Sequence, residues 1–165
     1  MPDTKSPGLP ASFDSRHFRN VLGRFATGVT VITAKHGEHT HGMTANAFVS
    51  VSLDPPLVLV SVANHSRMHQ ILPVSGSYGV SVLAEDQEAL SNHFAGRTIP
   101  GLEYEFVAHE GTPLLAGCVA HFVVRLVDAH PAGDHTLYIG RVEHFRACEN
   151  KPLLFYSGKY CQLRE

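Results

Sequence analysis

The chain has 165 residues, of which 44% are hydrophobic and 17% charged, with a formal net charge of −2 at pH 7 when histidines are counted as neutral. This length fits one domain that can bury a core, and this composition is typical of a folded protein rather than a disordered or membrane-embedded one. Because no Lys/Arg-rich run occurs, the charge pattern argues against a nucleic-acid or anionic-membrane partner.

The chain shows no targeting or membrane-spanning pattern. No apolar stretch reaches the roughly 18–20 residues that cross a bilayer, and the first residues lack the apolar core of a secretory signal. The three cysteines have no CxxC spacing, which predicts reduced thiols and a cytoplasmic protein. Residues 1–12 carry three prolines among polar residues, so we expect a disordered N-terminal tail ahead of a single domain over residues 13–165.

The first predicted element is a helix. Asp14 or Ser15 can cap it, and apolar residues at i, i+3, i+4 and i+7 carry it to about Phe25, before Gly28 ends it. The strands predicted after it cover residues 29–34, 39–48, 57–63, 78–83, around 106, 118–129, 137–148 and 153–156. Two more short helices are predicted, from Ser66 or Asn64 to about Leu72 and over 86–94, with Pro73 ending the former and Pro131 breaking the strand over 118–129.

This order of elements predicts the fold class. About seven strands stand against about three short helices, and most strand pairs have no helix between them. Crossover helices are needed for a parallel sheet, so an antiparallel barrel with peripheral helices is favoured over a doubly wound fold. No GxGxxG or GxxxxGK[ST] motif stands at a strand–helix junction, which argues against Rossmann and P-loop sites.

The segment over residues 41–66, HGMTANAFVSVSLDPPLVLVSVANHS, organises the prediction of a site. It holds two β-branched runs, over 47–53 and 57–63, joined at Asp54-Pro55-Pro56, where the prolines cannot continue a ladder and the chain must turn. Small polar residues flank these runs: Thr44, Asn46, Ser50, Ser52, Asn64 and Ser66. Such side chains suit a polar ligand that needs several donors, or they simply cap turns, and the residues alone leave both open.

Other chemistries find less support. His39 and His41 share one strand face near His36, but no third ligand follows at a fixed spacing, so a metal site is not expected. No GxSxG motif suggests a hydrolase, and Cys118, Cys148 and Cys161 lack the basic neighbours of a reactive thiol. Asp134 and His135, in GDHTLYIG, place a carboxylate and an imidazole at a tight turn that folding alone does not require.

Three separated motifs carry a resemblance to a known family. HGMTANAF over 41–48, SVSLDPPLVLVSV over 50–62 and GDHTLYIGRVE over 133–143 resemble the flavin reductases of the FMN-binding split-barrel superfamily. Those proteins are the NAD(P)H:flavin oxidoreductase components of two-component flavin-dependent monooxygenases. The similarity begins near Phe18 and runs to KPLLFYSGKY over 151–160, so it covers most of the chain.

The resemblance implies a fold and an activity. The fold is a mainly β split barrel of Greek-key type with peripheral short helices, forming a homodimer with flavin near the interface. The activity is hydride transfer from NADH or NADPH to FAD or FMN, with reduced flavin passed to a separate monooxygenase. NADH is favoured, because no arginine cluster marks a site for a 2′-phosphate. The alternatives are a split-barrel oxidoreductase that holds flavin tightly and acts on its own substrate, or a non-catalytic flavin-binding module.

The resemblance also implies site residues. His135 is the expected catalytic residue, beside the nicotinamide, and it positions the ring rather than moving protons. The segment Thr44-Ala45-Asn46-Ala47 is expected along the isoalloxazine, with Ala47 where the family commonly has serine. The other expected cofactor-binding residues are Ser50, Val51, Val62, Ala63, Asn64, Ser66, Arg67, Phe94, Ala95 and Tyr160. For Arg67 a solvated helix residue, and for Phe94 and Tyr160 a core aromatic, remain the alternatives.

Overall fold

The computed structural model describes residues 13–164, so the predicted N-terminal tail lies outside the described residues. No helix within this range is long and apolar enough to span a membrane. Three helices are present: α1 (Ser15–Leu22), α2 (Arg67–Ser75) and α3 (Glu88–Phe94). The strands are β1 (Thr27–Gly28), β2 (Thr30–His36), β3 (His39–Ala45), β4 (Phe48–Leu53), β5 (Pro56–Ala63), β6 (Ser77–Val82), β7 (Phe106–His109), β8 (Thr112–Leu115), β9 (Ala120–Ala132), β10 (His135–Ala147), β11 (Leu153–Tyr156) and β12 (Lys159–Gln162).

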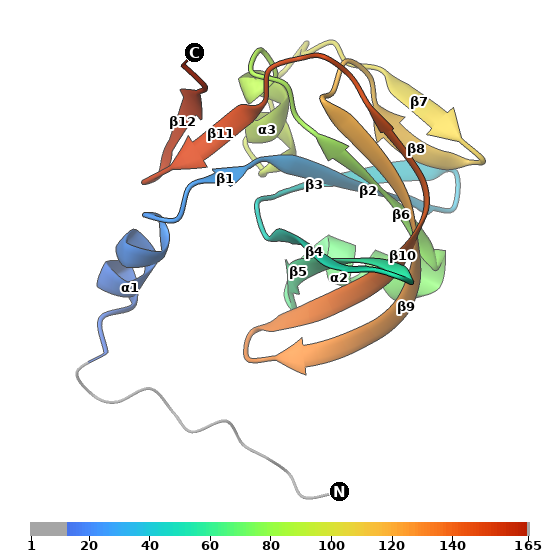
Figure 1. Cartoon of the computed structure of the whole chain (residues 1–165), viewed down its shortest axis with the longest axis horizontal. Coiled ribbons are helices and arrows are strands. Elements are labelled where there is room, and N and C mark those ends of the chain that lie inside the picture. The colour runs from blue at the N-terminus through green and yellow to red at the C-terminus, as the bar shows by residue number, and fades with distance from the viewer. Residues whose placement is uncertain (1–12, 165) are drawn as a thin grey trace, which may run out of the picture.

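A seven-stranded antiparallel sheet, in the order β3-β2-β6-β9-β10-β5-β4, forms the body of the molecule. The sheet curls around its core, but its end strands β3 and β4 do not pair with each other, so the barrel stays open (Figure 1). Smaller sheets, β1-β11-β12 and β7-β8, lie beside it. The expectation of a mainly β, antiparallel fold with few peripheral helices is confirmed.

The predicted hairpin at the double proline is confirmed. Leu53 pairs with Pro56 across the turn, and the Asp54–Pro55 peptide bond is cis. Along β5, Val58, Val60 and Val62 are buried while their neighbours are only half-buried. This alternation is what a strand with one core-facing side requires, and it fixes which face of the segment meets the core.

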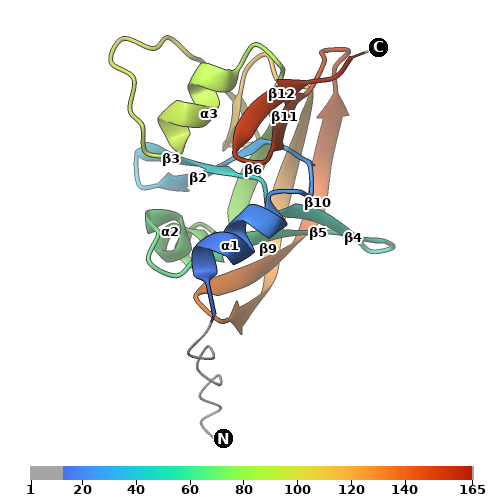
Figure 2. The ribbon, with the colours of Figure 1, turned by 90° about the vertical axis from the view of Figure 1, so that its left-hand side faces the viewer.

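Two apolar clusters form the core. One lies between the sheet and α2, and the other lies under α3 and the C-terminal strands (Figure 2). The first contains Ile32, Ala34, Val58, Val60, Val62, Met68, Ile71, Leu72, Tyr78, Val80, Val124 and Tyr138. The second contains Val29, Val31, Leu83, Leu90, Leu115, Cys118 and Leu153. The helices α2 and α3 therefore cover different parts of the curved sheet, and each buries one face of β2.

Two prolines that were expected to end elements do not. Pro73 lies inside α2, where its ring removes the hydrogen bond that the carbonyl of His69 would otherwise accept. The hydroxyl of Tyr138 donates to that carbonyl instead, at 3.1 Å. Pro131 lies within β9, beyond Arg125, the last residue of β9 that β6 pairs with. That edge of the strand is unpaired, so a residue without an N–H is tolerated there.

Other boundaries also differ from the prediction. Asp14 caps α1 as expected, accepting from the backbone N–H groups of Arg16 and His17, but the helix ends at Leu22 rather than Phe25. The strand expected over 39–48 ends at Ala45. The strands β8 and β12 were missed, because each pairs only with its own hairpin neighbour and has just four residues to carry a pattern.

Candidate functional site

The structure brings together the turn that carries His135 and the end of β5. His135 lies opposite Ala63 in the β5–β10 ladder. The backbone N–H of Asn64 donates to the carbonyl of Asp134 at 2.9 Å, and its side-chain amide donates to the carbonyl of Gly133 at 3.4 Å. The hydroxyl of Thr136 donates to Asn64 Oδ1 at 2.8 Å. The ladder pairing and these three hydrogen bonds thus fix the turn against a segment some seventy residues earlier in the chain.

The imidazole at this turn has a defined orientation. His135 Nδ1 lies 2.7 Å from Asp134 Oδ1, and the side chain is 43% exposed. Hydrogen bonding from His135, together with its charge, lowers the pKa of the Asp134 carboxyl below its ordinary value. Because Asp134 holds Nδ1, the other ring nitrogen, Nε2, is left for a ligand. Such a group can orient a polar ligand by a hydrogen bond.

The start of α2 lies next to this turn. Ser66 is the N-cap of the helix, and its hydroxyl accepts from the backbone N–H of His69 at 3.2 Å. The backbone N–H of Ser66 donates in turn to the carbonyl of Ala63 at 3.0 Å. Arg67 follows as the first helical residue, and it lines a small hollow with histidines of the β2–β3 hairpin. Ala63, Asn64, Ser66 and His135 therefore form one group, which we name the turn group, whereas Val62, opposite Thr136 in the ladder, is fully buried in the core.

A second group connects β3, α3 and β12. The hydroxyl of Thr44 donates to the carbonyl of Ser91 at 2.7 Å, and the buried hydroxyl of Ser91 lies 2.8 Å from that of Tyr160. A Cβ at Gly42 would lie 2.6 Å from the ring of Phe94, so the ring covers this glycine closely. Thr44, Ser91, Phe94 and Tyr160, which we name the β3 group, thus fix the segment that leads to Asn46.

The aromatic residues of this group also serve packing. The Phe94 ring makes edge contacts with Tyr104, at 5.2 Å between centroids, and Tyr160 packs at 5.4 Å on Phe155. Both residues are half-buried and belong to the cluster under α3. Ala95, the C-cap of α3, is exposed. Packing on the core accounts for Phe94 and Tyr160 without excluding contact with a ligand.

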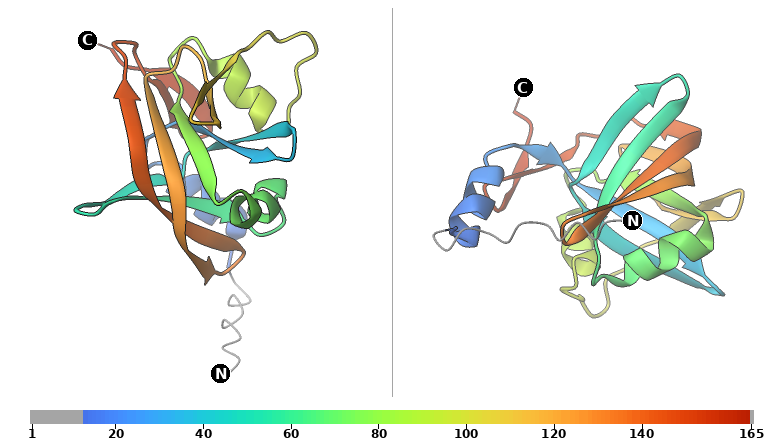
Figure 3. Two further views of the ribbon diagram at one scale, coloured as in Figure 1. Left: turned by 90° about the vertical axis from the view of Figure 1, so that its right-hand side faces the viewer. Right: turned by 90° about the horizontal axis from the view of Figure 1, so that it is seen from below.

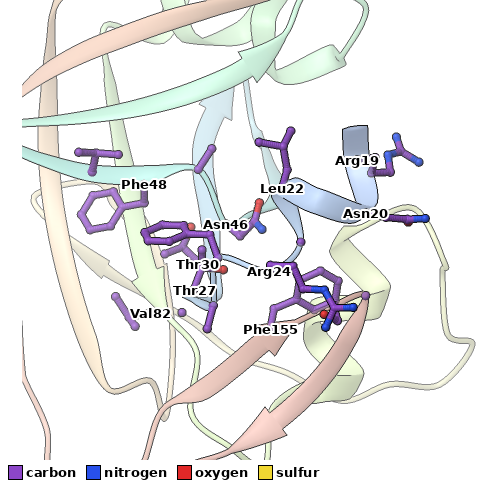
Figure 4. Close-up of a pocket in the computed structure, with 18 of the residues that line it drawn as sticks. Arg19, Asn20, Leu22, Arg24, Thr27, Thr30, Asn46, Phe48, Val82 and Phe155 are labelled. Atoms are coloured by element: carbon purple, nitrogen blue, oxygen red, sulfur yellow. The ribbon is translucent and has the colours of Figure 1, made fainter. Parts of the chain in front are cut away.

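A cleft of about 1220 Å³ opens beside Asn46 and Ala47. Figure 4 shows Asn46 between Leu22 and Thr30, with Arg24 and Phe155 toward β11. Within the described residues, the hydroxyl of Thr27, which also lines the cleft, is buried without a hydrogen-bond partner. The full lining comprises Arg19, Asn20, Leu22, Gly23, Arg24, Phe25, Ala26, Thr27, Gly28, Thr30, Asn46, Ala47, Phe48, Val49, Val82, Ala120, Phe122, Phe155, Ser157 and Gly158.

Sequence reasoning missed most of the cleft. Its walls come from α1, β1, β4 and β11, which are distant in sequence, and no motif links them. One signal was present: Leu22 and Phe25 belong to the apolar face predicted for the first helix. That face is largely uncovered within the described residues, since Phe18, Val21, Leu22 and Phe25 are 48%, 53%, 57% and 80% exposed.

The structure does not bring Ser50 and Val51 to either group. Both are exposed on the edge strand β4, and Ser50 pairs with Val58, five residues along β5 from Ala63. At about 3.3 Å per residue this is roughly 16 Å from the His135 turn. Their assignment to a cofactor stays a prediction.

Other chemistries remain unsupported in the part of the chain that the structure describes. No cluster of three or more histidine, cysteine or acidic side chains is arranged to hold a metal ion. All three cysteines are free. Burial raises the pKa of the Cys118 thiol to about 12, which suppresses the reactive thiolate.

Comparison with known proteins places the chain in a family. The sequence model of the family described as "Flavin reductase like domain" matches residues 22–164. An NADH-dependent flavin reductase of Rhodococcus sp. is 49% identical over 150 residues, covering 89% of this chain and 85% of that protein. The reductase component of the 4-hydroxyphenylacetate 3-monooxygenase of Thermus thermophilus is 43% identical, covering 84% and 89%.

A solved structure agrees with these matches. The flavin reductase PheA2 in its native state superposes with a TM-score of 0.90 and 46% identity, covering 93% of this chain and all of that one. Sequence and fold thus match together over nearly the whole described range. The chain belongs to the flavin reductase like family.

Proposed function

We propose that the protein is an NADH-dependent flavin reductase that uses FAD or FMN. Hydride transfer between nicotinamide and flavin is chemistry that the two cofactors supply themselves. The protein must then bind, orient and shield the rings. The observation that carries the proposal is the clamped turn at Gly133–His135, which presents an oriented imidazole beside the cap of α2 in a chain of this family.

The residues present fit a flavin and a nicotinamide. The β3 group holds Thr44-Ala45-Asn46-Ala47, whose amides and short side chains suit the polar edge of the isoalloxazine, and Phe94 supplies an apolar wall. Asn64 and Ser66 supply amide and hydroxyl groups next to the turn. His135, through Nε2, positions the nicotinamide while Asp134 holds Nδ1. Ser50, Val51, Val62, Ala63, Arg67, Ala95 and Tyr160 complete the proposed cofactor-binding set.

The first test is NADH oxidation at 340 nm, with FAD, FMN, riboflavin or no flavin added. We expect turnover that depends on added flavin and saturates with it, and the flavin with the highest kcat/KM identifies the preferred substrate. Turnover without added flavin would instead support an oxidoreductase with a tightly held flavin. Absence of turnover with both NADH and NADPH would contradict the proposal and leave a flavin-binding module.

A second test addresses His135. His135→Ala should raise the KM for NADH about tenfold or more while flavin affinity stays nearly unchanged, because one charge-assisted or polar contact to the nicotinamide is lost. His130→Ala, an equal truncation on the same β9–β10 hairpin, is the matched control and should leave both constants unchanged. Equal losses of NADH and flavin affinity in His135→Ala would show that the imidazole does not serve the nicotinamide.

We also propose that a second copy of the chain covers α1. The helix stands apart from the large sheet in two views (Figures 1 and 3), and its exposed apolar residue Leu22, with Phe25 just after the helix, borders the cleft beside Asn46. An apolar face of this kind is unfavourable in water unless it is covered. Light scattering after gel filtration should give a dimer for the native chain and a monomer for Phe25→Ser. Val127→Ser, a similar change at an exposed residue of β9, should stay dimeric; a monomeric native chain would contradict the proposal.

The remaining proposals concern the partner enzyme and the cellular location of the protein. A separate monooxygenase is the proposed acceptor of the reduced flavin, supported by the relative from Thermus thermophilus, which is named as the reductase component of such a system. A cytoplasmic location is proposed because all three cysteines are free, as in reducing compartments. The proposed monooxygenase partner is tested by measuring monooxygenase turnover with NADH and flavin, in the presence and in the absence of this protein.

A further inference from the structure

The loop between α3 and β7, over residues 95–105, is tied to the last turn of α3. Figures 2 and 3 show it arching outward from the helix before it returns to the body of the molecule. Near its middle, the backbone N–H of Ile99 donates to His93 Nδ1 at 3.1 Å, a hydrogen bond that we name the loop anchor. At its start, Arg97 donates to Asn92 through its backbone N–H, at 3.0 Å, and through its guanidinium, at 3.2 Å. The imidazole of His93 therefore ties down the part of the loop beyond Arg97.

A cluster of aromatic rings connects this anchor to β3. The ring of His93 lies 5.1 Å from that of Phe94 and 5.4 Å from that of Tyr104, between centroids. Tyr104, which the loop carries, lies in turn 5.2 Å from Phe94 and 5.5 Å from Phe106 of β7. Phe94 covers Gly42 of β3, the strand that leads to the proposed ring-binding segment. Phe94 thus packs between β3 and a ring whose position depends on the loop.

Little apolar burial holds the loop in place. Ile99 and Leu102 are half-buried, and Leu102 packs against the cluster under α3. The remaining residues of the loop are exposed, Tyr104 among them at 41%. Segments with few buried apolar contacts are those that open most readily in a folded protein. The order of this loop therefore depends more on single hydrogen bonds, such as the loop anchor, than the order of a core strand does.

The loop anchor requires one protonation state of the imidazole. In a neutral imidazole one nitrogen donates and the other accepts, so the acceptor role of Nδ1 places the proton of His93 on Nε2. A protonated imidazole carries N–H groups on both nitrogens and cannot accept from Ile99. Histidines ordinarily gain this proton between pH 8 and pH 5. His93 also lies in the last turn of α3, where the helix dipole favours a positive charge. Protonation therefore breaks the anchor and leaves a charged ring that the helix end stabilises.

The surroundings of His93 do not oppose this change. Within residues 13–164, no ion pair involves its imidazole. Gly42 and Thr44 face α3, so His39 and His41, at the alternate positions of β3, lie on the other face of the strand. The titratable side chains of α3, of the loop and of the adjoining strand faces are Glu88, Arg97, Glu103, Tyr104, Glu105, Lys35 and Tyr160, whereas His109 of β7 stacks on His144. His93 can therefore gain a proton without breaking an ion pair.

We propose that His93 is a positioning residue, which holds the loop over residues 95–105, and through it Phe94, only while its imidazole is neutral. Its effect on flavin rests on the proposed function, in which Phe94 is an apolar wall of the flavin site. When His93 is protonated, the loop is released, Tyr104 leaves Phe94, and the wall loses its order. Flavin affinity should therefore be highest where His93 is neutral and should fall as the pH falls through the range in which histidines titrate.

Two substitutions of His93 separate the hydrogen bond from the charge. His93→Asn keeps an acceptor, Oδ1, close to the position of Nδ1, but it gains no proton in this range. His93→Leu keeps an apolar side chain and has no acceptor. The matched control is His39→Asn, the same change at an exposed histidine on the face of β3 away from α3. Melting temperatures equal to that of the native protein verify the fold of each variant.

The first measurement follows the loop anchor in protein without flavin. NMR gives the protection of the Ile99 amide against exchange with solvent, relative to an unprotected amide at the same pH. We expect this protection to fall about tenfold from pH 8 to pH 5 in the native protein and in His39→Asn, because one hydrogen bond is lost. His93→Asn should stay protected at both pH values, and His93→Leu should be unprotected at both. Full protection of the native protein at pH 5, or an equal fall in His93→Asn, would overturn the proposal.

The second measurement follows the wall through the affinity for riboflavin. This probe lacks a phosphate, whose own titration near pH 6 would otherwise change binding. Fluorescence titration gives its Kd at pH 8 and pH 5.5. We expect binding about fivefold weaker at pH 5.5 for the native protein and for His39→Asn. His93→Asn should lose this dependence, and His93→Leu should bind weakly at both pH values. The same dependence in His93→Asn as in the native protein would show that the anchor does not act through Phe94.

The two measurements distinguish this inference from the proposed function. If riboflavin, FMN and FAD all fail to bind, the proposed function fails, and the exchange of the Ile99 amide still decides whether His93 holds the loop. If flavin is bound and reduced, but His93→Leu binds riboflavin as tightly as the native protein does at pH 8, flavin reduction stands and the positioning role of His93 is rejected.

Discussion

Replacing Asn64 by alanine should destabilise the fold through one buried hydroxyl. Thr136 is 6% exposed, and its hydroxyl donates to Asn64 Oδ1 at 2.8 Å. Without that acceptor the hydroxyl remains buried and unsatisfied, which costs about 1–3 kcal/mol. The bond to the carbonyl of Gly133 is long, at 3.4 Å, and exposed, so water replaces it at little cost. The buried bond therefore sets the magnitude.

A double-mutant cycle tests this reasoning. Thr136→Val keeps the shape of the side chain and removes the hydroxyl, so Asn64→Ala should cost little when it is made in that background. We expect a coupling of about 1 kcal/mol or more in the free energy of unfolding by urea at pH 7. Asn64→Asp retains an acceptor for Thr136 and serves as the control, with stability above that of Asn64→Ala. An equal cost for Asn64→Ala in both backgrounds would refute the argument.

Three further predictions follow from packing and charge. A Cβ at Gly79 would lie 2.3 Å from a backbone oxygen of the neighbouring β7–β8 hairpin, so Gly79→Ala should lower stability by about 1–3 kcal/mol or more; an unchanged melting temperature would contradict this. Iodoacetamide at pH 8 should modify the half-buried Cys148 well before Cys118, whose buried thiol has a pKa of about 12, and peptide mass spectrometry reports the order. Hydrogen bonding from Arg125 lowers the pKa of Glu143, so their pairing stabilises the fold above the ordinary carboxylate pKa and is lost as the pH falls through the lowered value. Arg125→Gln should accordingly lower the urea midpoint at pH 7 and leave it unchanged near pH 2; a difference that persists in acid would show another cause.

Local patterns in the sequence were sufficient for much of the fold. The alternation of Val58, Val60 and Val62 depends only on the two-residue period of a strand, and the prolines after Asp54 stop a ladder wherever it occurs. The sequence offered Asp14 or Ser15, and Ser66 or Asn64, as caps; the structure uses Asp14 and Ser66, each of which accepts from backbone N–H groups two or three residues further on. These features are set within a few residues, so they were predicted without knowledge of the partner segments.

The site was only partly predictable, because local patterns mark its segments but do not show how distant segments meet. The motifs around Asn46, Asn64 and His135 marked the segments, and the resemblance gave them a chemistry. Nothing in the spacing showed that Asn64 clamps the turn of His135, or that Ser50 lies far from both. Those distances depend on which strands pair and in which register, and pairing is a property of the whole sheet.

The sequence by itself therefore determined most of the strands, the candidate caps of α1 and α2, the hairpin at the double proline and the family. The tertiary structure alone decided three things. It let α2 continue through Pro73, because the hydroxyl of Tyr138 replaces the missing donor. It joined Thr44 to α3 through Ser91. It gathered His36, His39, His41 and Arg67 around one hollow. Each depends on groups from separate elements of the fold, and only the curling of the sheet and the packing of the helices on it bring such groups within reach.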